Sequence, residues 1–143
     1  MKRAAFAFLA AGSLIGAAAP PQPSVTHVDA KVVAEALAHG GPLGSTADYK
    51  VSGNVRNKSG EVEVHARETD IFYITAGEAT IVTGGTVIGA HETEPGQIRG
   101  SDIKGGLSQQ VVKGDVMTIA AGTPHWFKVV SSPVSYFVVK VIK

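Results

Sequence analysis

The stretch DIFYITAGEATIVTGG, Asp70 to Gly85, contains two runs of mainly β-branched, aromatic and small residues that meet at Gly77 and Glu78. Short runs of this composition, separated by a glycine, are typical of two neighbouring strands joined by a tight turn. The stretch therefore predicts a strand pair, for which the rest of the chain has to supply partners.

The segments on either side repeat the same two-residue period. YKVSGNV from Tyr49 alternates apolar with polar residues, and EVEVH does so again after the turn NKSG. QQVVKGDVMTIAAGTPHWFKVV is interrupted at Lys113-Gly114 and around Gly122, and VSYFVVKVIK is a final strand with few polar residues. Many short strands with glycine-rich turns predict an all-β sandwich or barrel.

One connection is unusual. IGAHETEPGQIRGSDIKGG, Ile88 to Gly106, is too long and polar for a hairpin. Long loops in compact domains are commonly lids or binding loops, although a flexible surface segment fits the same sequence. Within it, Arg99 is a candidate to bind a substrate carboxylate or phosphate, and His91 is a weaker candidate; solvated loop charges are the alternative.

The N-terminal part carries two further signals. MKRAAFAFLAAGSLIGAAAPPQP has a basic start, a short apolar run and small residues before prolines, which is the pattern of a secretory signal peptide; a membrane anchor is the alternative. THVDAKVVAEALAHGG then predicts one short helix, with Thr26 and Asp29 as a weak capping box and Gly40 at its end. We expect a signal peptide at 1–19, a linker and short helix at 20–47, and a barrel domain at 48–143.

Composition limits the function. The chain has 143 residues, 44% of them hydrophobic, which suits one domain with a real core. The formal charge is +1, and removal of Lys2 and Arg3 leaves 11 Lys+Arg against 12 Asp+Glu, so nothing attracts nucleic acid. The chain has no cysteine, which excludes a disulfide and a lipoprotein anchor. We expect a periplasmic or secreted protein that has no membrane attachment after cleavage.

GDVMTIAAGTPH resembles the second sequence motif of the cupins, with Gly114, Gly122 and the metal-binding His125 in place. Ala120 stands where that motif usually has proline, and Val129 where it has asparagine. The first cupin motif, His-x-His, three or four residues, Glu, six residues, Gly, is similar to the pattern formed by Glu63, His65, Asp70 and Gly77, with Gly60 displaced from the motif's opening glycine.

The resemblance covers roughly residues 49–142, and it is closest to small single-domain bacterial cupins. It implies a cupin-type jelly-roll β-barrel that binds a small molecule, with a divalent metal held by His65, His125, Glu63 and Asp70. It also implies a homodimer, because the edge strands of such barrels need covering and VSYFVVKVIK is apolar enough to be at risk if exposed.

The chemistry can also be argued from the residues alone. Residues two apart in a strand share a face, so Glu63 and His65 project together, and strand pairing can bring Asp70 and His125 beside them. Two imidazoles with one or two carboxylates suit Fe(II), Mn(II), Zn(II) or Ni(II). Such a metal polarises a carbonyl or hydroxyl, or activates oxygen.

A simpler interpretation competes with this one. Val62 and Val64 can equally be the core face of their strand, which would leave Glu63 and His65 in water. Asp70 would then brace a turn, and His125 would be a packed, hydrogen-bonded histidine. The sequence does not fix the register.

Two aromatic residues complete the candidate site. Phe72 and Phe127 share strand parity with Asp70 and His125, so they can wall a substrate pocket, although core packing is the common role of such residues. Three functions remain open: a metal-dependent cupin enzyme acting as an oxygenase, isomerase or decarboxylase, a non-catalytic ligand-binding cupin, and a structural barrel with a degenerate metal site.

Overall fold

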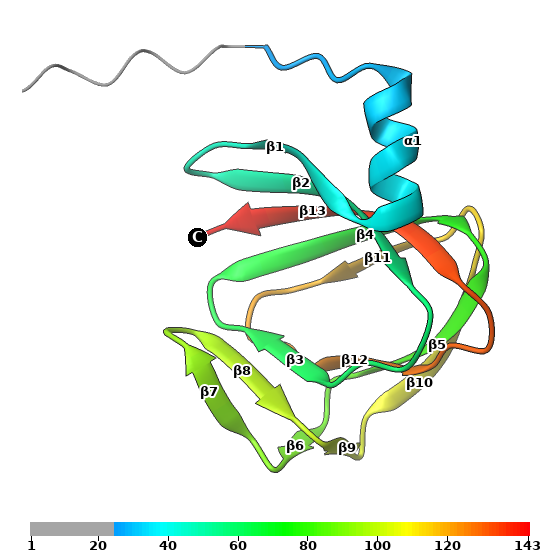
Figure 1. Cartoon of the computed structure of the whole chain (residues 1–143). Coiled ribbons are helices and arrows are strands. Elements are labelled where there is room, and N and C mark those ends of the chain that lie inside the picture. Colours follow the sequence, from blue (N-terminus) through cyan, green and yellow to red (C-terminus); the bar gives the residue numbers. More distant parts are fainter. Residues whose placement is uncertain (1–24) are drawn as a thin grey trace, which may run out of the picture.

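The computed structural model describes residues 25–143, so the expected signal peptide at 1–19 and the start of the linker lie outside the described residues. Two antiparallel sheets face each other and enclose the core (Figure 1). The predicted all-β architecture with one short helix is confirmed. None of the helices in the described part of the chain is long and apolar enough to cross a membrane.

The first sheet has five strands in the order β1 (Gly41–Ser45), β2 (Tyr49–Arg56), β13 (Val134–Ile142), β4 (Glu68–Ala76) and β11 (Val116–Ile119). The second has six, in the order β10 (Leu107–Val112), β5 (Glu78–Thr83), β12 (His125–Val129), β3 (Val62–His65), β8 (Gln97–Gly100) and β7 (His91–Glu94). A small ribbon pairs β6 (Thr86–Ile88) with β9 (Asp102–Lys104). Because β1 belongs to the first sheet, the sheet begins before the expected boundary at residue 48.

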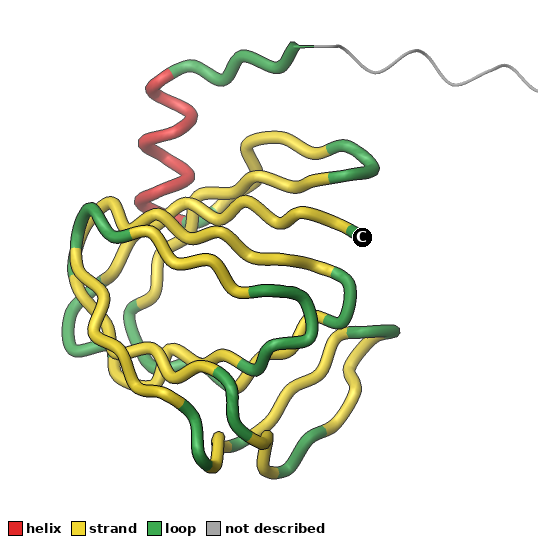
Figure 2. Tube along the Cα trace, turned by 180° about the vertical axis from the view of Figure 1, so that it is seen from behind, coloured by secondary structure: helices red, strands yellow, loops and turns green. Residues whose placement is uncertain are grey.

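The helix α1 (Ala30–His39) lies outside the sheets, as Figure 2 shows from behind. Its N-cap is Asp29, whose carboxylate accepts hydrogen bonds from the backbone amides of Lys31 and Val32, and not the expected Thr26. The helix packs on β2 at Gly53, where a Cβ atom would come within 2.7 Å of the Ala36 backbone. Only glycine allows this close approach of helix and sheet.

The turn between β4 and β5 explains one glycine of the first cupin-like motif. Gly77 has φ +74°, a conformation that favours glycine, and a Cβ atom there would collide with the carbonyl of Pro133. The junction expected at Gly77-Glu78 is therefore confirmed, together with the strand breaks around Gly114 and Gly122.

The long segment at 88–106 is not a loop, contrary to our expectation. It forms most of β6 to β9, and β8 pairs with β3 along its full length. These strands have only three or four residues each and are separated by Gly89 and Gly96, both with positive φ, so no extended alternating pattern marks them in the sequence. The pairing carries Arg99 to a position beside the candidate site.

The barrel interior is apolar at one end. The core lies between the two sheets and contains these buried residues: Phe72, Ile74, Ala79, Ile81, Val111, Ile119, Phe127, Val134, Tyr136 and Val138. A second, smaller cluster of Val62, Val82 and Ile103 packs on the other side of β3. Both faces of β3 are thus covered, because the ribbon of β6 and β9 shields the face that carries Val62.

The final strand is not an edge. β13 pairs with β2 on one side and β4 on the other, in the middle of its sheet. The argument that VSYFVVKVIK needs a partner subunit is therefore wrong, since its backbone groups are already paired within the chain. The homodimer itself stays a prediction.

Candidate metal centre

The inner faces of β4, β12 and β13 change from apolar to polar toward the same end of the barrel. On β4 the inward positions read Glu68 and Asp70, followed by the apolar Phe72 and Ile74, and all four are buried. On β13, Lys140 lies opposite Asp70. The alternation of each strand therefore gathers the polar side chains at one end of the interior.

Register brings the other members of the site together. His125 on β12 lies opposite Glu63 on β3, and Glu63 lies opposite Arg99 on β8. His65 lies opposite Gln97. Direct cross-strand neighbours have their Cβ atoms about 5 Å apart, so adjacent strands place these side chains in contact range.

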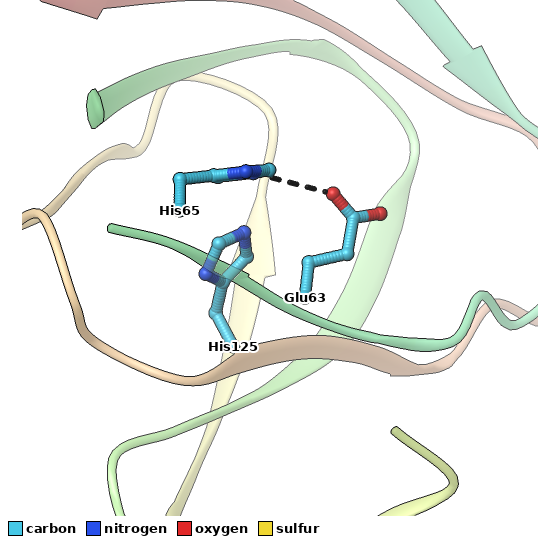
Figure 3. A group of neighbouring side chains, drawn as sticks. All are labelled: Glu63, His65 and His125. Carbon is cyan, nitrogen blue, oxygen red and sulfur yellow. Dashed lines mark ion pairs between the residues drawn. The ribbon is translucent and has the colours of Figure 1, made fainter. Parts of the chain in front are cut away.

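Glu63, His65, Asp70 and His125 form one cluster, and Figure 3 shows three of them pointing toward one another. The Nε2 atom of His65 lies 3.4 Å from Glu63 Oε2 and 3.5 Å from Asp70 Oδ2. His125 Nε2 lies 3.6 Å from the same Asp70 oxygen. Both imidazoles are at least 96% buried, so the expectation that His65 faces water is excluded.

Both histidines present an Nε2 atom to the cluster because the other ring nitrogen is occupied. The Nδ1–H of His65 donates to the amide oxygen of Gln97, and that of His125 donates to the Thr123 carbonyl, 3.1 Å away. Among the described residues, His65 Nε2 is the one buried side-chain nitrogen or oxygen without a hydrogen-bond partner. Metal-binding imidazoles are held by their second nitrogen in this way.

Glu63 is fixed by a guanidinium. Arg56 Nη2 donates to Glu63 Oε1 at 2.9 Å, its Nε donates to the Tyr136 hydroxyl at 3.0 Å, and the group lies over the Phe127 ring. Burial opposes ionisation of Glu63, but the contact with His65 and the charge of Arg56 outweigh it and lower the pKa of Glu63 to about 2. The carboxylate is therefore ionised and keeps Oε2 directed at His65.

The pKa values of the two histidines are shifted in opposite directions. Burial lowers the pKa of His125, which keeps this imidazole neutral with an available lone pair. Burial also disfavours the charged form of His65, but its contacts with Glu63, Gln97 and Asp70 prevail, and its pKa is raised. A metal ion that binds here must displace any proton that His65 Nε2 carries, so the raised pKa makes metal binding weaker as the pH falls.

Asp70 does not brace a turn, as the simpler interpretation had it. Lys140 Nζ lies 2.7 Å and 3.0 Å from its two oxygens. The same ammonium lies 3.3 Å from Glu68 Oε2, and Lys50 Nζ lies 2.9 Å from Glu68 Oε1. A chain of alternating charges thus runs from the interior to the surface.

A pocket of about 590 Å³ opens onto this end of the barrel. Its wall includes Arg99, as expected for a substrate-binding residue, but not Phe72 and Phe127, which are 3% exposed and pack in the core with Tyr136. Charged and polar side chains dominate the pocket near the cluster: Lys50, Glu63, His65, Glu68, Glu94, Gln97, Arg99 and Lys140.

Sequence reasoning missed four residues of the site. Glu68 has the parity of Asp70 in the same strand, which is a usable signal, and Lys140 has the parity of the inward Val138. Gln97 lay in the segment that we had interpreted as a loop. Arg56 is the last residue of β2 and reaches Glu63 across the turn that leads to β3, a side-chain contact that strand alternation does not reveal.

No model of a known protein family matches the chain, and no curated protein matches its sequence. Solved structures do. A protein of Bacillus halodurans has 13% identity and a TM-score of 0.52, and the match covers 71% of this chain and 68% of that one. An uncharacterized conserved protein with a double-stranded β-helix domain, from Klebsiella pneumoniae, has 14% identity and a TM-score of 0.50, with 71% and 73% covered. This chain has the cupin fold.

A weaker match is Peruvianin-I, a cysteine peptidase from Thevetia peruviana latex, with 14% identity, a TM-score of 0.45 and 66% of this chain covered. The match spans 51% of that protein's length. At these identities the shared property is the cupin barrel alone. What the site of this barrel does has to be argued from its own residues.

The residues present fit a divalent metal. Two groups of three, namely Glu63, His65 and His125, and His65, Glu68 and Asp70, offer ligand atoms within 4.8 Å of one another. Imidazole nitrogen with carboxylate oxygen is the donor set of Fe, Mn, Zn and Ni sites, and the unpartnered Nε2 of His65 needs such a partner. A buried His/Glu/Asp cluster able to bind a metal therefore lies in this barrel.

Proposed function

We propose that this cupin binds a divalent metal ion through His65 and His125, with carboxylate oxygen from the same cluster, which contains Glu63 and Asp70, and that a small metabolite binds in the adjoining pocket. The single observation that carries the proposal is the buried Nε2 of His65, which has no hydrogen-bond partner in the described chain and faces a second imidazole and two carboxylates. Leaving such an atom unpaired costs about 1–3 kcal/mol.

The chain's own residues divide the remaining tasks. Gln97 and Thr123 hold the proton of each imidazole on Nδ1, and Arg56 holds Glu63 in its ionised form. When bound, the metal supplies Lewis acidity or activates oxygen, which is compatible with oxygenase, isomerase or decarboxylase chemistry. Which of these reactions takes place depends on the small molecule that the pocket admits.

The pocket favours an anionic group on that molecule. No ion pair joins Arg99 to a carboxylate among residues 25–143; its Nη1 donates only to the neighbouring backbone carbonyl of Ile98. A guanidinium on a pocket wall binds a carboxylate or phosphate in bidentate geometry. The position of Arg99 opposite Glu63 supports its role as the residue that orients the substrate.

Metal titration tests the proposal. Metal-free protein is incubated with Fe(II), Mn(II), Zn(II) or Ni(II), and bound metal is measured by mass spectrometry of the elements and by calorimetry. We expect one ion per chain, and a loss of at least tenfold in affinity for His65→Ala and for His125→Ala, because the ligands bind cooperatively. His91→Ala is the matched control, since that histidine is exposed and belongs to neither group of candidate ligands.

A second function rests on a specific observation. Lys140 supplies a positive charge to Asp70 without any metal, so the barrel can also work as a non-catalytic ligand-binding or structural cupin. Protein that stays metal-free with all four ions would favour this alternative and contradict the metal proposal.

We also propose that the mature protein is periplasmic or secreted. The support is the order of Lys2 and Arg3, a short apolar run and small residues at the start of the sequence. N-terminal sequencing of the protein from its native host tests this. We expect a start near residues 19–22, and an intact Met1 in a membrane fraction would contradict the proposal.

A further inference from the structure

The strongest unexplained feature of the site is the lysine inside it. Lys140 projects inward from the middle strand of its sheet, directly opposite Asp70. Its Nζ contacts both oxygens of that carboxylate, at 2.7 Å and 3.0 Å, and the Asp70 side chain is 3% exposed. The Lys140 side chain is only partly buried, but an ammonium held this closely by a buried carboxylate is a strong partner for it.

Glu63 and Asp70 are therefore not equivalent. Arg56 engages only Oε1 of Glu63, and Oε2 stays directed at His65 Nε2. At Asp70, the oxygen that faces both imidazoles, Oδ2, is one of the two that Lys140 contacts. A divalent ion that used Asp70 would have to place a second cation beside Lys140, at the cost of charge repulsion.

We propose that Lys140 excludes Asp70 from the metal's coordination, so that the ion is held by the two imidazoles of His65 and His125 and the single carboxylate of Glu63. The inference rests on the proposed metal site and assigns its ligand set. Lys140 and Asp70 are positioning residues, which act through the histidines. A two-histidine, one-carboxylate set leaves positions open on the metal for a small molecule from the pocket.

The experiment measures Mn(II) affinity by calorimetry for the full mature chain and a set of variants. Relative to the wild type, we expect the single variant Glu63→Gln to bind Mn(II) at least tenfold more weakly. The single variant Asp70→Asn should bind it no more than threefold more weakly. Lys140→Gln removes the positive charge beside Asp70, which makes this carboxylate available to the metal, and should strengthen binding at least tenfold. That gain should disappear in the double variant Asp70→Asn/Lys140→Gln, which closes a double-mutant cycle.

Lys128→Gln is the control. This lysine also lies near a carboxylate, Asp102, but neither residue lines the pocket or belongs to a candidate ligand group. Its Mn(II) affinity should stay within threefold of the wild type. Far-UV circular dichroism and urea unfolding verify that every variant is folded. If Lys140→Gln does not fold, the comparison of Glu63→Gln with Asp70→Asn decides the question.

Two results would overturn the inference. One is an Asp70→Asn variant that loses as much affinity as Glu63→Gln, which would make Asp70 a ligand. The other is a Lys140→Gln variant with unchanged affinity. A wild type that binds no Mn(II) while Lys140→Gln binds it would contradict the proposed function but support the role of Lys140, and absence of binding in both would contradict both.

Discussion

Glu63 has two carboxylate oxygens with separate partners: Oε1 accepts a hydrogen bond from Arg56, and Oε2 faces His65. The Arg56 guanidinium is in turn fixed by the Tyr136 hydroxyl and by the ring of Phe127 below it. Phe127, which was expected to wall a pocket, therefore holds the arginine that orients the acid, and Phe72 packs against Phe127 and Tyr136. Their contribution to the site is indirect, through packing.

This arrangement predicts that the unfolding free energy of the metal-free protein falls at acidic pH. The pKa of Glu63 is about 2 in the folded chain against an ordinary value of 4.5, so the unfolded chain binds more protons between these values. The ionised Glu63 therefore contributes its full stabilisation above pH 4.5. As the pH falls toward 2, this contribution to the unfolding free energy decreases by about 2 to 3 kcal/mol. Urea unfolding at pH 2 to 6 measures this loss.

The control is Glu63→Gln, which cannot titrate at this position. The difference in unfolding free energy between the wild type and this variant should shrink steadily from pH 5 to pH 2. A difference that stays constant over this range would show that Glu63 is not stabilised as an anion.

Gln97 predicts a second effect at the residue scale. Its amide oxygen accepts the Nδ1–H of His65, which leaves Nε2 as the free nitrogen. Gln97→Leu removes this acceptor while keeping similar size, so metal affinity should fall about 10- to 100-fold. Calorimetry with Mn(II) measures the change. Gln109→Leu, at an exposed position of β10, should leave the affinity unaltered, and equal losses in both variants would rule out a specific role of Gln97.

At the element scale, β8 matters more than its length indicates. This four-residue strand pairs with β3 and carries both Gln97, beside His65, and Arg99, beside Glu63. The segment before it had no pattern that predicts a strand, because its turns and strands alternate every few residues. The site therefore depends on an element that is held in place mainly by pairing with β3 and β7.

In contrast to β8, the helix α1 contributes no residue to the site. It packs outside the first sheet, and none of its residues lines the pocket. Gly53→Ala would place a Cβ atom 2.7 Å from the Ala36 backbone, so helix and strand must move apart. We expect a loss of about 1 to 3 kcal/mol in unfolding free energy, with metal affinity unchanged. Urea unfolding and calorimetry measure the two quantities.

Gly44→Ala provides the comparison for this prediction. Gly44 lies on β1 with an ordinary φ, and the nearest atom to its added Cβ would be 3.9 Å away, at Thr26. Its stability should stay within about 0.5 kcal/mol of the wild type. Loss of metal binding in Gly53→Ala would contradict this prediction, because it would show that the position of α1 affects the geometry of the site.

At the scale of the whole molecule, the sequence predicted the barrel because alternation and glycine turns are local signals. The strands around Gly77, Gly114 and Gly122 lie where these signals place them. The proximity of Glu63, His65, Asp70 and His125 was expected from the spacing of the cupin-like motifs. The contacts of Lys140 with Asp70 and of Arg56 with Tyr136 were not, because they depend on which strands become neighbours, and that order is set by non-local pairing.

The oligomeric state is a further whole-molecule prediction. The argument for a homodimer from an exposed β13 is wrong, because β13 lies inside its sheet. The described sheets nevertheless have four edge strands, namely β1, β11, β10 and β7. Unpaired strand edges favour association unless they are short, twisted or covered. We expect light scattering at micromolar concentration to give twice the mass of the mature chain, and a monomer would contradict the dimer.

The last prediction concerns the coupling of the metal site to the stability of the barrel. The ligand candidates on β3 and β4 are close in the sequence, but His125 on β12 is far from them along the chain, so the unfolded chain cannot assemble the complete site. A metal that binds only the folded state at 100 times its dissociation constant adds about 2.7 kcal/mol of stability. For a domain of this size, the melting temperature should rise by roughly 10 °C with Mn(II) and return to its starting value with a chelator. His125→Ala should fold without showing this rise, because one of the two imidazoles is missing. An equal rise in His125→Ala would locate the bound metal elsewhere on the chain and contradict coordination by this cluster.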